Sequence, residues 1–374
     1  MPLVSDESNR AECAADWRKD MEKKRLEYMD MAKGIGIIGI VIMHSSTMPE
    51  SVVYWISSFA LPFFFLISGM MMSCGREKER DMRAVLCRKG RSLMIPFFCF
   101  SLISVLLLLE QCVKGISDWE TVRAGLLSIV TLKGFSVFWF LPALFLGECL
   151  FLFLVKRLSG INACLVSLVL TVVSYLANGA LSEQEAVVAA FFGLSLLTDF
   201  LRTFLRAAYA LPLICVGYYL FERHRDFWER EERFSIGCMA GGLGLFFAGI
   251  PLSIVNGSVD FRTMAMGRIP PLEYLSVALS SVGLLLICKN CRPFRPLVFY
   301  GKNSLIVMAT HMDFSFVYYA HVVAYMVNDY IPRLNRVCFF VNVTGIVLLL
   351  EVPCILVINR FFPFLLGRRR KAKA

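Results

Sequence analysis

Two ionisable residues, Lys33 and His44, lie eleven positions apart at the ends of an apolar stretch. At about 100° per residue this spacing makes three helical turns plus roughly 20°, so both side chains share one face, roughly 16 Å apart. Asp30 lies about one turn before Lys33 on the same face. Such a row suits an anionic ligand at the cation and proton transfer by the imidazole, whose unperturbed pKa is near neutral. Lys33 could instead extend to the membrane surface, and His44 could be a core histidine with satisfied hydrogen bonds.

Arg88 and Arg91 form a second group of cations, one turn apart where a later apolar stretch begins. Guanidinium groups bind phosphate oxygens through paired N–H donors, and free N–H groups at a helix N-terminus attract the same anion. We therefore expect Lys33, Arg88 and Arg91 to hold a phosphate-bearing ligand. Topology alone also explains clustered arginines, because cytoplasmic segments of membrane proteins are rich in Lys and Arg.

Four further side chains within or beside apolar stretches are candidates for lining the same site: Ser68, Trp139, Glu148 and His311. Ionisable groups inside hydrocarbon are costly and usually face the interior of a helix bundle. A packing serine, an interfacial tryptophan and a core histidine remain the plainer alternatives. The partners of Glu148, and of a second carboxylate at Glu351, cannot be assigned from the sequence.

These residues need a membrane-spanning scaffold, because 57% of the 374 residues are hydrophobic and the mean hydropathy is +0.64. A soluble domain of this size does not have that composition. We predict an all-α, polytopic membrane helix bundle of about ten spans, each close to the ~20 residues that a bilayer core requires. The predicted spans are 34–50, 53–73, 93–113, 136–155, 161–179, 205–221, 235–255, 272–288, 303–325 and 337–359. Residues 183–204 are predicted to form an interfacial or re-entrant helix.

The distribution of charge orients this bundle. Most of the 39 Lys and Arg residues fall in alternate inter-span segments, which places both termini in the cytoplasm. We divide the chain into a charged cytoplasmic segment 1–30, a membrane domain 31–362 and a basic cytoplasmic tail 363–374, and expect no cleavable signal peptide. The excess of cations is explained by topology, so we expect no nucleic-acid partner. Most of the 13 cysteines lie in apolar runs as small hydrophobic residues, and we expect no metal site.

Five motifs in this order resemble the acyltransferase 3 family of multi-pass membrane O-acyltransferases, over roughly residues 25–325. The motifs are Asp-x-x-Lys-Gly-(x)9-His from Asp30, Pro-x-Phe-Phe-x-x-Ser-Gly from Pro62, Arg91 followed by Leu93 and Pro96, Trp-Phe-Leu-Pro-Ala-Leu from Trp139, and Gly-Lys-Asn-Ser-Leu from Gly301 followed by His311. Each motif is weak alone, but five in the right order are fairly specific. The resemblance implies about ten spans and transfer of an acyl group, often acetyl, from acyl-CoA to a carbohydrate or glycolipid hydroxyl.

In that family a basic residue, often Arg, precedes the histidine by eleven positions, and Lys33 and His44 occupy these places. Lysine at this position resembles a subgroup similar to fucose 4-O-acetylases. We expect His44 to act as general base, with Asp30 orienting Lys33, and Lys33, Arg88 and Arg91 on the phosphates of acetyl-CoA or another acyl-CoA. Acyl-CoA is then a co-substrate and no cofactor is bound permanently. The resemblance also implies a lipid-embedded protein of the bacterial cytoplasmic (inner) membrane.

Other functions remain compatible with these residues. A transporter or flippase of a lipid-linked sugar would also have ten spans and buried charges, although no inverted repeat is visible. A non-catalytic scaffold would leave the polar row of the first span unexplained. A different membrane O-acyltransferase could use His311 as its key histidine. The acceptor hydroxyl, the acyl chain length, direct transfer or an acyl-enzyme, and the oligomeric state are open at this stage.

Overall fold

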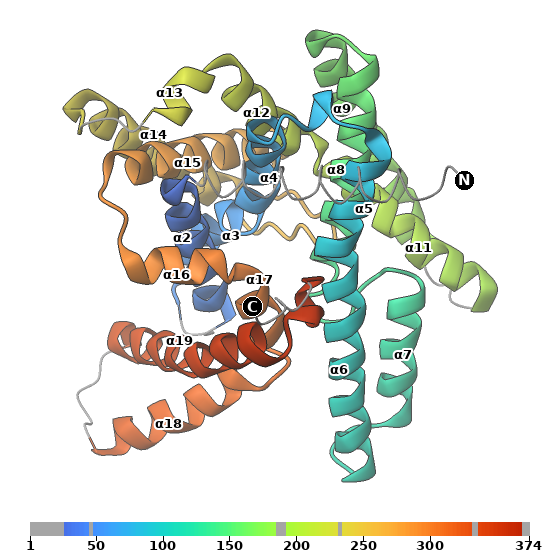
Figure 1. The fold of residues 1–374 in the computed structure, drawn as a ribbon. Coiled ribbons are helices and arrows are strands. Elements are labelled where there is room, and N and C mark those ends of the chain that lie inside the picture. The colour runs from blue at the N-terminus through green and yellow to red at the C-terminus, as the bar shows by residue number, and fades with distance from the viewer. Residues whose placement is uncertain (1–25, 45–47, 185–191, 231–233, 331–335, 369–374) are drawn as a thin grey trace, which may run out of the picture.

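The computed structural model describes residues 26–44, 48–184, 192–230, 234–330 and 336–368, which form helices joined by mostly short connections (Figure 1). Their only β interaction is an isolated antiparallel bridge between Asp260 and Ala265, so the predicted all-α fold class is confirmed. The helices are α2 (Glu27–His44), α3 (Glu50–Phe59), α4 (Pro62–Cys74), η1 (Glu77–Glu79), α5 (Met82–Lys89), η2 (Gly90–Met94), α6 (Ile95–Val113), α7 (Trp119–Val130), α8 (Phe140–Arg157), α9 (Gly160–Glu183), α11 (Phe192–Tyr209), α12 (Leu211–Arg223), α13 (Arg225–Glu229), α14 (Ile236–Asn256), α15 (Pro270–Asn290), α16 (Arg295–Lys302), α17 (Ser304–Thr310), α18 (Phe316–Tyr330), α19 (Arg336–Phe361) and η3 (Pro363–Leu366).

Seven helical stretches of the described chain are long and apolar enough to cross a bilayer. They are Glu50–Cys74, Met82–Val113, Gly160–Glu183, Gly193–Arg223, Ile236–Asn256, Pro270–Asn290 and Phe339–Phe361. The sequence predicted about ten spans. The difference includes α2 and α8, which have 18 residues and three charged side chains each. These charged side chains either are predicted site residues or lie at the ends of the helices. Whether α2 and α8 can cross a bilayer therefore depends on how far their charges are buried and paired.

Two predicted segments differ from the structure. The predicted span 303–325 is divided, because α17 ends at Thr310 and α18 begins only at Phe316, after the polar residues His311 and Asp313. A separate interfacial or re-entrant helix over 183–204 is also not observed. Residues 192–204 belong to α11, which continues with one break at Ala210 into α12, while residues 185–191 lie outside the described residues.

Prolines interrupt two of the long stretches. α3 ends at Phe59 and α4 begins at Pro62, as the proline in the predicted second span suggested. Between α5 and α6 the chain makes one π-turn, Gly90–Met94, just before Pro96, which has no N–H to donate. π-Turns within helices are rare and frequently lie at functional sites.

The helix that carries Lys33 and His44 lies inside the bundle. α2 contacts α3, α4, α15, α16, α17 and α19, and Figure 1 shows it between α15 and the layer of α16 and α19. The approach of α16 is so close that a Cβ atom on Gly34 would overlap the carbonyl of Leu297, and one on Gly301 would overlap that of Asp30. The two glycines therefore let the short helix α16 pack directly against the backbone of α2.

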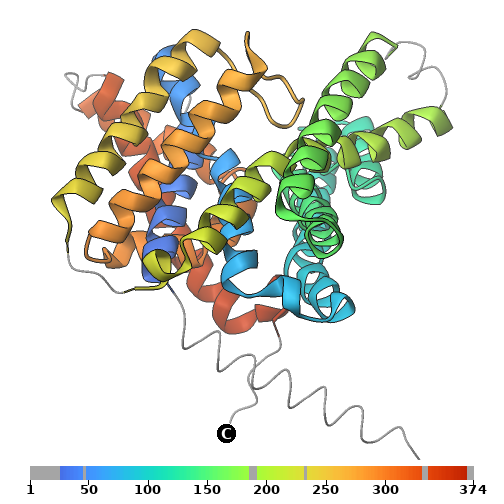
Figure 2. The ribbon, with the colours of Figure 1, turned by 90° about the horizontal axis from the view of Figure 1, so that it is seen from above.

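Glycines also set the spacing of two helix pairs. α14 and α15 lie side by side (Figure 2), with Gly242 and Gly249 facing α15, whereas a Cβ on Gly241 would meet open space. α4 and α12 approach through Gly69 and Gly217, where the backbones are in contact. Small residues at such interfaces let the helix backbones approach closely.

We expect Gly217→Ala to destabilise the fold by about 1–3 kcal/mol, because the added methyl group overlaps the carbonyl of Leu66 and overpacking has that typical cost. Gly241→Ala is the matched control, since its methyl group meets open space. Thermal unfolding in detergent should show a lower Tm for Gly217→Ala. It should show no decrease in Tm for Gly241→Ala. Equal Tm values for both variants would contradict the close contact of α4 and α12.

Candidate functional site

The structure brings together the two histidines from the ends of α2 and α17. The Nδ1 atom of His44 lies 3.2 Å from the Nε2 atom of His311, although the residues are 267 positions apart. The rings are tilted by 35°, with 5.1 Å between their centroids. His311 is completely buried and His44 is partly exposed. The sequence proposed both residues, but it could not show that they are in contact.

Hydrogen bonding determines the tautomer of this pair. The Nδ1 atom of His311 lies 2.7 Å from the carbonyl oxygen of Val307, which can only accept, so this Nδ1 carries the proton. In a neutral His311 the Nε2 atom is then an acceptor, and it receives the Nδ1–H of His44. The Nε2 atom of His44 then carries the lone pair, and it has no hydrogen-bond partner among the residues that the structure describes. The geometry thus supplies a partly exposed imidazole ready to accept a proton.

A threonine and a carboxylate stand behind the pair. The Thr310 hydroxyl lies 2.9 Å and 2.8 Å from the two carboxylate oxygens of Glu351, and both residues are fully buried. Thr310 directly precedes His311. The carboxylate whose partner could not be assigned from the sequence therefore anchors the end of α17 to α19.

At the opposite end of α2, Lys33 and Asp30 form the pair that their spacing predicted. The Lys33 ammonium lies 2.7 Å from the Asp30 carboxylate, one helical turn before it. Asp30 is 3% exposed, and the Lys33 side chain retains 15% of its exposure. Asp30 is thus positioned to fix the direction of Lys33. The role of this pair in binding an anion stays a prediction.

A buried ionic cluster joins α4, η1, α5 and α8. The Lys89 ammonium lies 3.0 Å from the Glu148 carboxylate and 2.8 Å from that of Glu77. Glu148 also accepts a hydrogen bond from the Ser68 hydroxyl, and Glu77 accepts one from Arg88. Two carboxylates and two cations therefore balance one another, in an environment where an unpaired charge would be costly.

This cluster includes two residues that the sequence did not single out, Glu77 and Lys89. Both lie in a strongly charged stretch that reads as an exposed cytoplasmic loop, yet they are only 4% and 5% exposed. Arg88, expected to hold a phosphate, is engaged by Glu77, while Arg91 is exposed on the π-turn. No local pattern distinguishes the buried cations of this run from the exposed ones.

The remaining candidate, Trp139, lies apart from the cluster around Glu148. Its buried ring stacks under the guanidinium group of Arg206, 5.7 Å from the ring centroid. Within the described ranges, no group of three or more His, Cys, Asp or Glu side chains could hold a metal ion. Seven of the nine predicted site residues thus fall into three groups: the histidine pair, the Asp30–Lys33 pair, and Ser68 and Arg88 in the ionic cluster with Glu148. Arg91 and Trp139 lie outside these groups.

Comparison with known proteins identifies a family that fits this arrangement. The family model of the acyltransferase 3 domain, described as an acyltransferase domain, matches residues 26–358. The match spans nearly every helix described above, including all three groups of site residues. No match was found among curated proteins or among solved structures.

Proposed function

Because the chain belongs to the acyltransferase 3 family, we propose that it is a membrane O-acyltransferase acting on a cell-surface or lipid-linked carbohydrate. The acyl group, most simply acetyl, comes from acyl-CoA. The contact between His44 and His311 is the observation that carries this proposal, since it leaves a basic imidazole nitrogen available inside an acyltransferase domain. A resemblance to fucose 4-O-acetylases, through Lys33, fits the same acceptor chemistry.

In the proposed reaction His44 accepts the proton of the acceptor hydroxyl at Nε2 as the oxygen attacks the thioester carbonyl. The carbon–sulfur bond then breaks, and the imidazolium returns the proton to the departing thiolate of coenzyme A. His311 acts as a positioning residue, because its Nε2 holds the Nδ1–H of His44. The products are an ester on the sugar and free coenzyme A.

We further propose that α2 and α8 cross the membrane, with both termini in the cytoplasm of a bacterial cell and about ten spans in total. Each helix has 18 residues, about 27 Å at 1.5 Å per residue, which approaches the thickness of a bilayer core. Asp30, Lys33 and Glu148 are paired inside the protein, which lowers the cost of placing them in hydrocarbon, and the other charges of the two helices lie at their ends. In this orientation Lys33, Arg88 and Arg91 lie toward the cytoplasm, where acyl-CoA is found.

We expect Lys33→Ala to raise the KM for acyl-CoA about tenfold or more with a smaller change in kcat, because it removes a charge-assisted contact to phosphate. Lys33→Arg should retain most of the affinity, since it keeps the positive charge. Steady-state kinetics with varied acetyl-CoA measures both values. If both variants behave alike, the charge at this position is not what binds the donor.

The function can be tested in cells by mass spectrometry of their surface and lipid-linked glycans. Cells that produce the chain should contain glycans heavier by one acyl group per modified sugar, and cells with the His44→Ala variant at equal membrane abundance should not. Glycans that are unchanged in composition but differently distributed across the membrane would instead support a flippase and contradict the proposal.

A further inference from the structure

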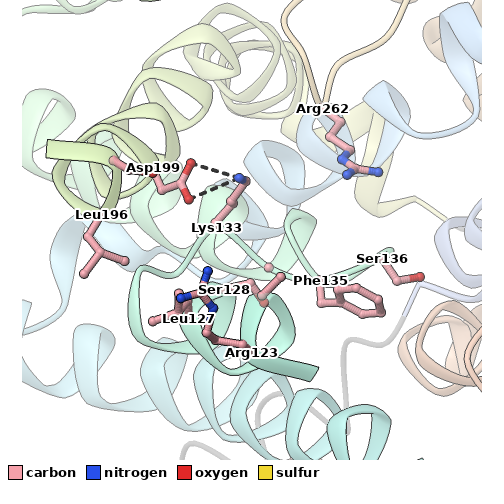
Figure 3. A pocket seen from close by; sticks show the side chains of 12 residues that line it. Arg123, Leu127, Ser128, Lys133, Phe135, Ser136, Leu196, Asp199 and Arg262 are labelled. Carbon is pink, nitrogen blue, oxygen red and sulfur yellow. Dashed lines mark hydrogen bonds and ion pairs between the residues drawn. The ribbon is translucent and has the colours of Figure 1, made fainter. Parts of the chain in front are cut away.

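A separate pocket lies between α7, α11, the segment 131–136 and the loop that joins α14 to α15 (Figure 3). Its volume is about 830 Å³, within the range of roughly 300–1,000 Å³ that small-molecule sites occupy. Its polar lining includes Arg123, Lys133, Asp199 and Arg262. None of these residues belongs to the three groups described above, so the pocket needs an explanation of its own.

The pocket carries more positive than negative charge. The Lys133 ammonium lies 2.9 Å and 3.1 Å from the two oxygens of Asp199, so this pair is neutral. Arg123 forms a largely exposed ion pair with Glu120, at 2.9 Å. Arg262 has no ion-pair partner among the residues that the structure describes. Figure 3 shows Arg123 below Lys133 and Arg262 to its right. Three of the four charged residues that line the pocket are cations, and such an excess of positive charge attracts anions.

A buried arginine, Arg206, holds the backbone of two residues that line this pocket. Arg206 is 7% exposed, and its Nε donates to the carbonyl of Arg262 at 2.6 Å while its Nη1 donates to that of Lys133 at 3.2 Å. Its guanidinium group stacks on Trp139, and the Asp260 carboxylate accepts the backbone N–H of Arg262 at 2.8 Å. The backbones that carry two of the pocket cations, Lys133 and Arg262, are therefore held by the hydrogen bonds of Arg206.

The segment 131–136 is held in an unusual conformation. Leu132, Gly134 and Ser136 have φ values of 56°, 75° and 52°, in the left-handed region that residues with a Cβ rarely adopt. The Thr203 hydroxyl donates to the carbonyl of Leu132 at 3.2 Å and helps to hold this shape. Such backbone conformations persist where the surroundings enforce them, and they concentrate at ligand sites.

We propose that this pocket binds the anionic group, phosphate or carboxylate, of the acceptor saccharide. The inference rests on the proposed acyltransferase function and adds the chemical class of its acceptor. Ser136, in the pocket lining, lies near Asp313, two residues from His311. A saccharide anchored by its charge in the pocket would thus extend toward the histidine pair.

The pocket and the ionic cluster lie at opposite ends of α8, which fits an acceptor that enters from the side opposite to the donor. α8 begins at Phe140, beside the pocket, and ends about 27 Å away at Arg157. At that far end Lys156 donates to the carbonyls of Lys78 and Arg80, next to the ionic cluster. Donor and acceptor would therefore approach the imidazole from opposite ends of the bundle.

The test is binding of glucose 6-phosphate, glucuronate and glucose to the purified chain by calorimetry, with no acyl-CoA present. We expect the two anionic sugars to bind and glucose to bind at least about tenfold more weakly. Arg262→Gln should weaken the anionic sugars about tenfold. Arg268→Gln is the matched control, because this exposed arginine lies in the same loop but does not line the pocket, and it should leave binding unchanged.

Three results would overturn the proposal: equal binding of glucose and the anionic sugars, no binding of any sugar, or equal effects of the two arginine substitutions. A phospholipid headgroup is a second source of the same anion. Sugar binding in nanodiscs of phosphatidylglycerol or phosphatidylcholine distinguishes the two sources. Loss of sugar binding only in phosphatidylglycerol would show that the pocket binds a lipid headgroup, and would contradict the proposal that it binds a saccharide.

Kinetics distinguishes failure of this inference from failure of the proposed function. With a functional enzyme, Arg262→Gln should raise the KM for an anionic acceptor and leave the KM for acetyl-CoA unchanged. If the Arg262→Gln variant transfers the acyl group with an unaltered KM for the acceptor, the proposed role of the pocket is wrong but the proposed acyltransferase function stands. If the unsubstituted chain transfers no acyl group, the proposed acyltransferase function is wrong. The calorimetry would then still decide whether the pocket binds anionic sugars.

Discussion

His44→Ala is expected to lower kcat for acyl transfer by about 10²- to 10⁴-fold, the range that general bases typically contribute. The alanine side chain cannot accept the proton of the acceptor hydroxyl, whereas the remaining fold loses only one partly exposed ring. Transfer of acetyl from acetyl-CoA by the purified variant measures the effect. His224→Ala, at an exposed histidine between α12 and α13, is the matched control and should retain full activity.

The positioning role of His311 gives this prediction a second part. His311→Ala should lower kcat less than His44→Ala, because the base remains but its tautomer is no longer fixed. His311→Gln should restore part of the activity, since the amide oxygen can accept the Nδ1–H of His44. A loss that is larger at His311 than at His44, without rescue by glutamine, would assign the role of base to His311 and overturn the mechanism.

Glu148→Ala is expected to destabilise the protein by about 3–5 kcal/mol, the usual result of removing one partner from a buried ion pair. The substitution leaves Lys89 with Glu77, which Arg88 also engages, and leaves the Ser68 hydroxyl without its acceptor. Denaturant unfolding in mild detergent measures the change. Glu148→Gln should have a smaller effect, because the amide oxygen can still accept from Ser68.

An exposed ion pair provides the control for this second prediction. Lys114 and Glu110 form a pair at the end of α6, with more than half of each side chain exposed. Glu110→Ala should change the stability by no more than about 1 kcal/mol, as is usual for surface pairs. Equal effects at Glu110 and Glu148 would show that the cluster around Lys89 is hydrated, and would contradict its buried position.

The features that could be predicted from the sequence are those set by local spacing or by composition. Asp30 and Lys33 lie one turn apart on a helix, so their ion pair follows from the spacing alone. Pro62 predicted the break between α3 and α4, because proline cannot donate a backbone hydrogen bond within a helix. The long apolar runs likewise predicted an all-helical membrane protein.

The features that could not be predicted depend on contacts between distant parts of the chain. The histidine pair joins residues 267 positions apart, and the sequence signals for each one, its spacing and its family motif, say nothing about contact between them. Lys89 and Glu77 look like ordinary members of a charged loop, and their burial results from the packing of η1 against α4 and α8. The left-handed conformations at Leu132 and Ser136 could not be predicted either, because neither residue is a glycine, the residue type that usually indicates a positive φ.

The central claim is that the imidazole at the end of α2 helps to move an acyl group from a thioester to a sugar hydroxyl. The most direct measurement supplies the purified chain in proteoliposomes with acetyl-CoA labelled in its acetyl group, together with membrane glycans. The account predicts label in alkali-labile esters on the glycan, and its loss when His44 is replaced by alanine. Unlabelled glycans with the unsubstituted chain, or equal labelling by both chains, would contradict it.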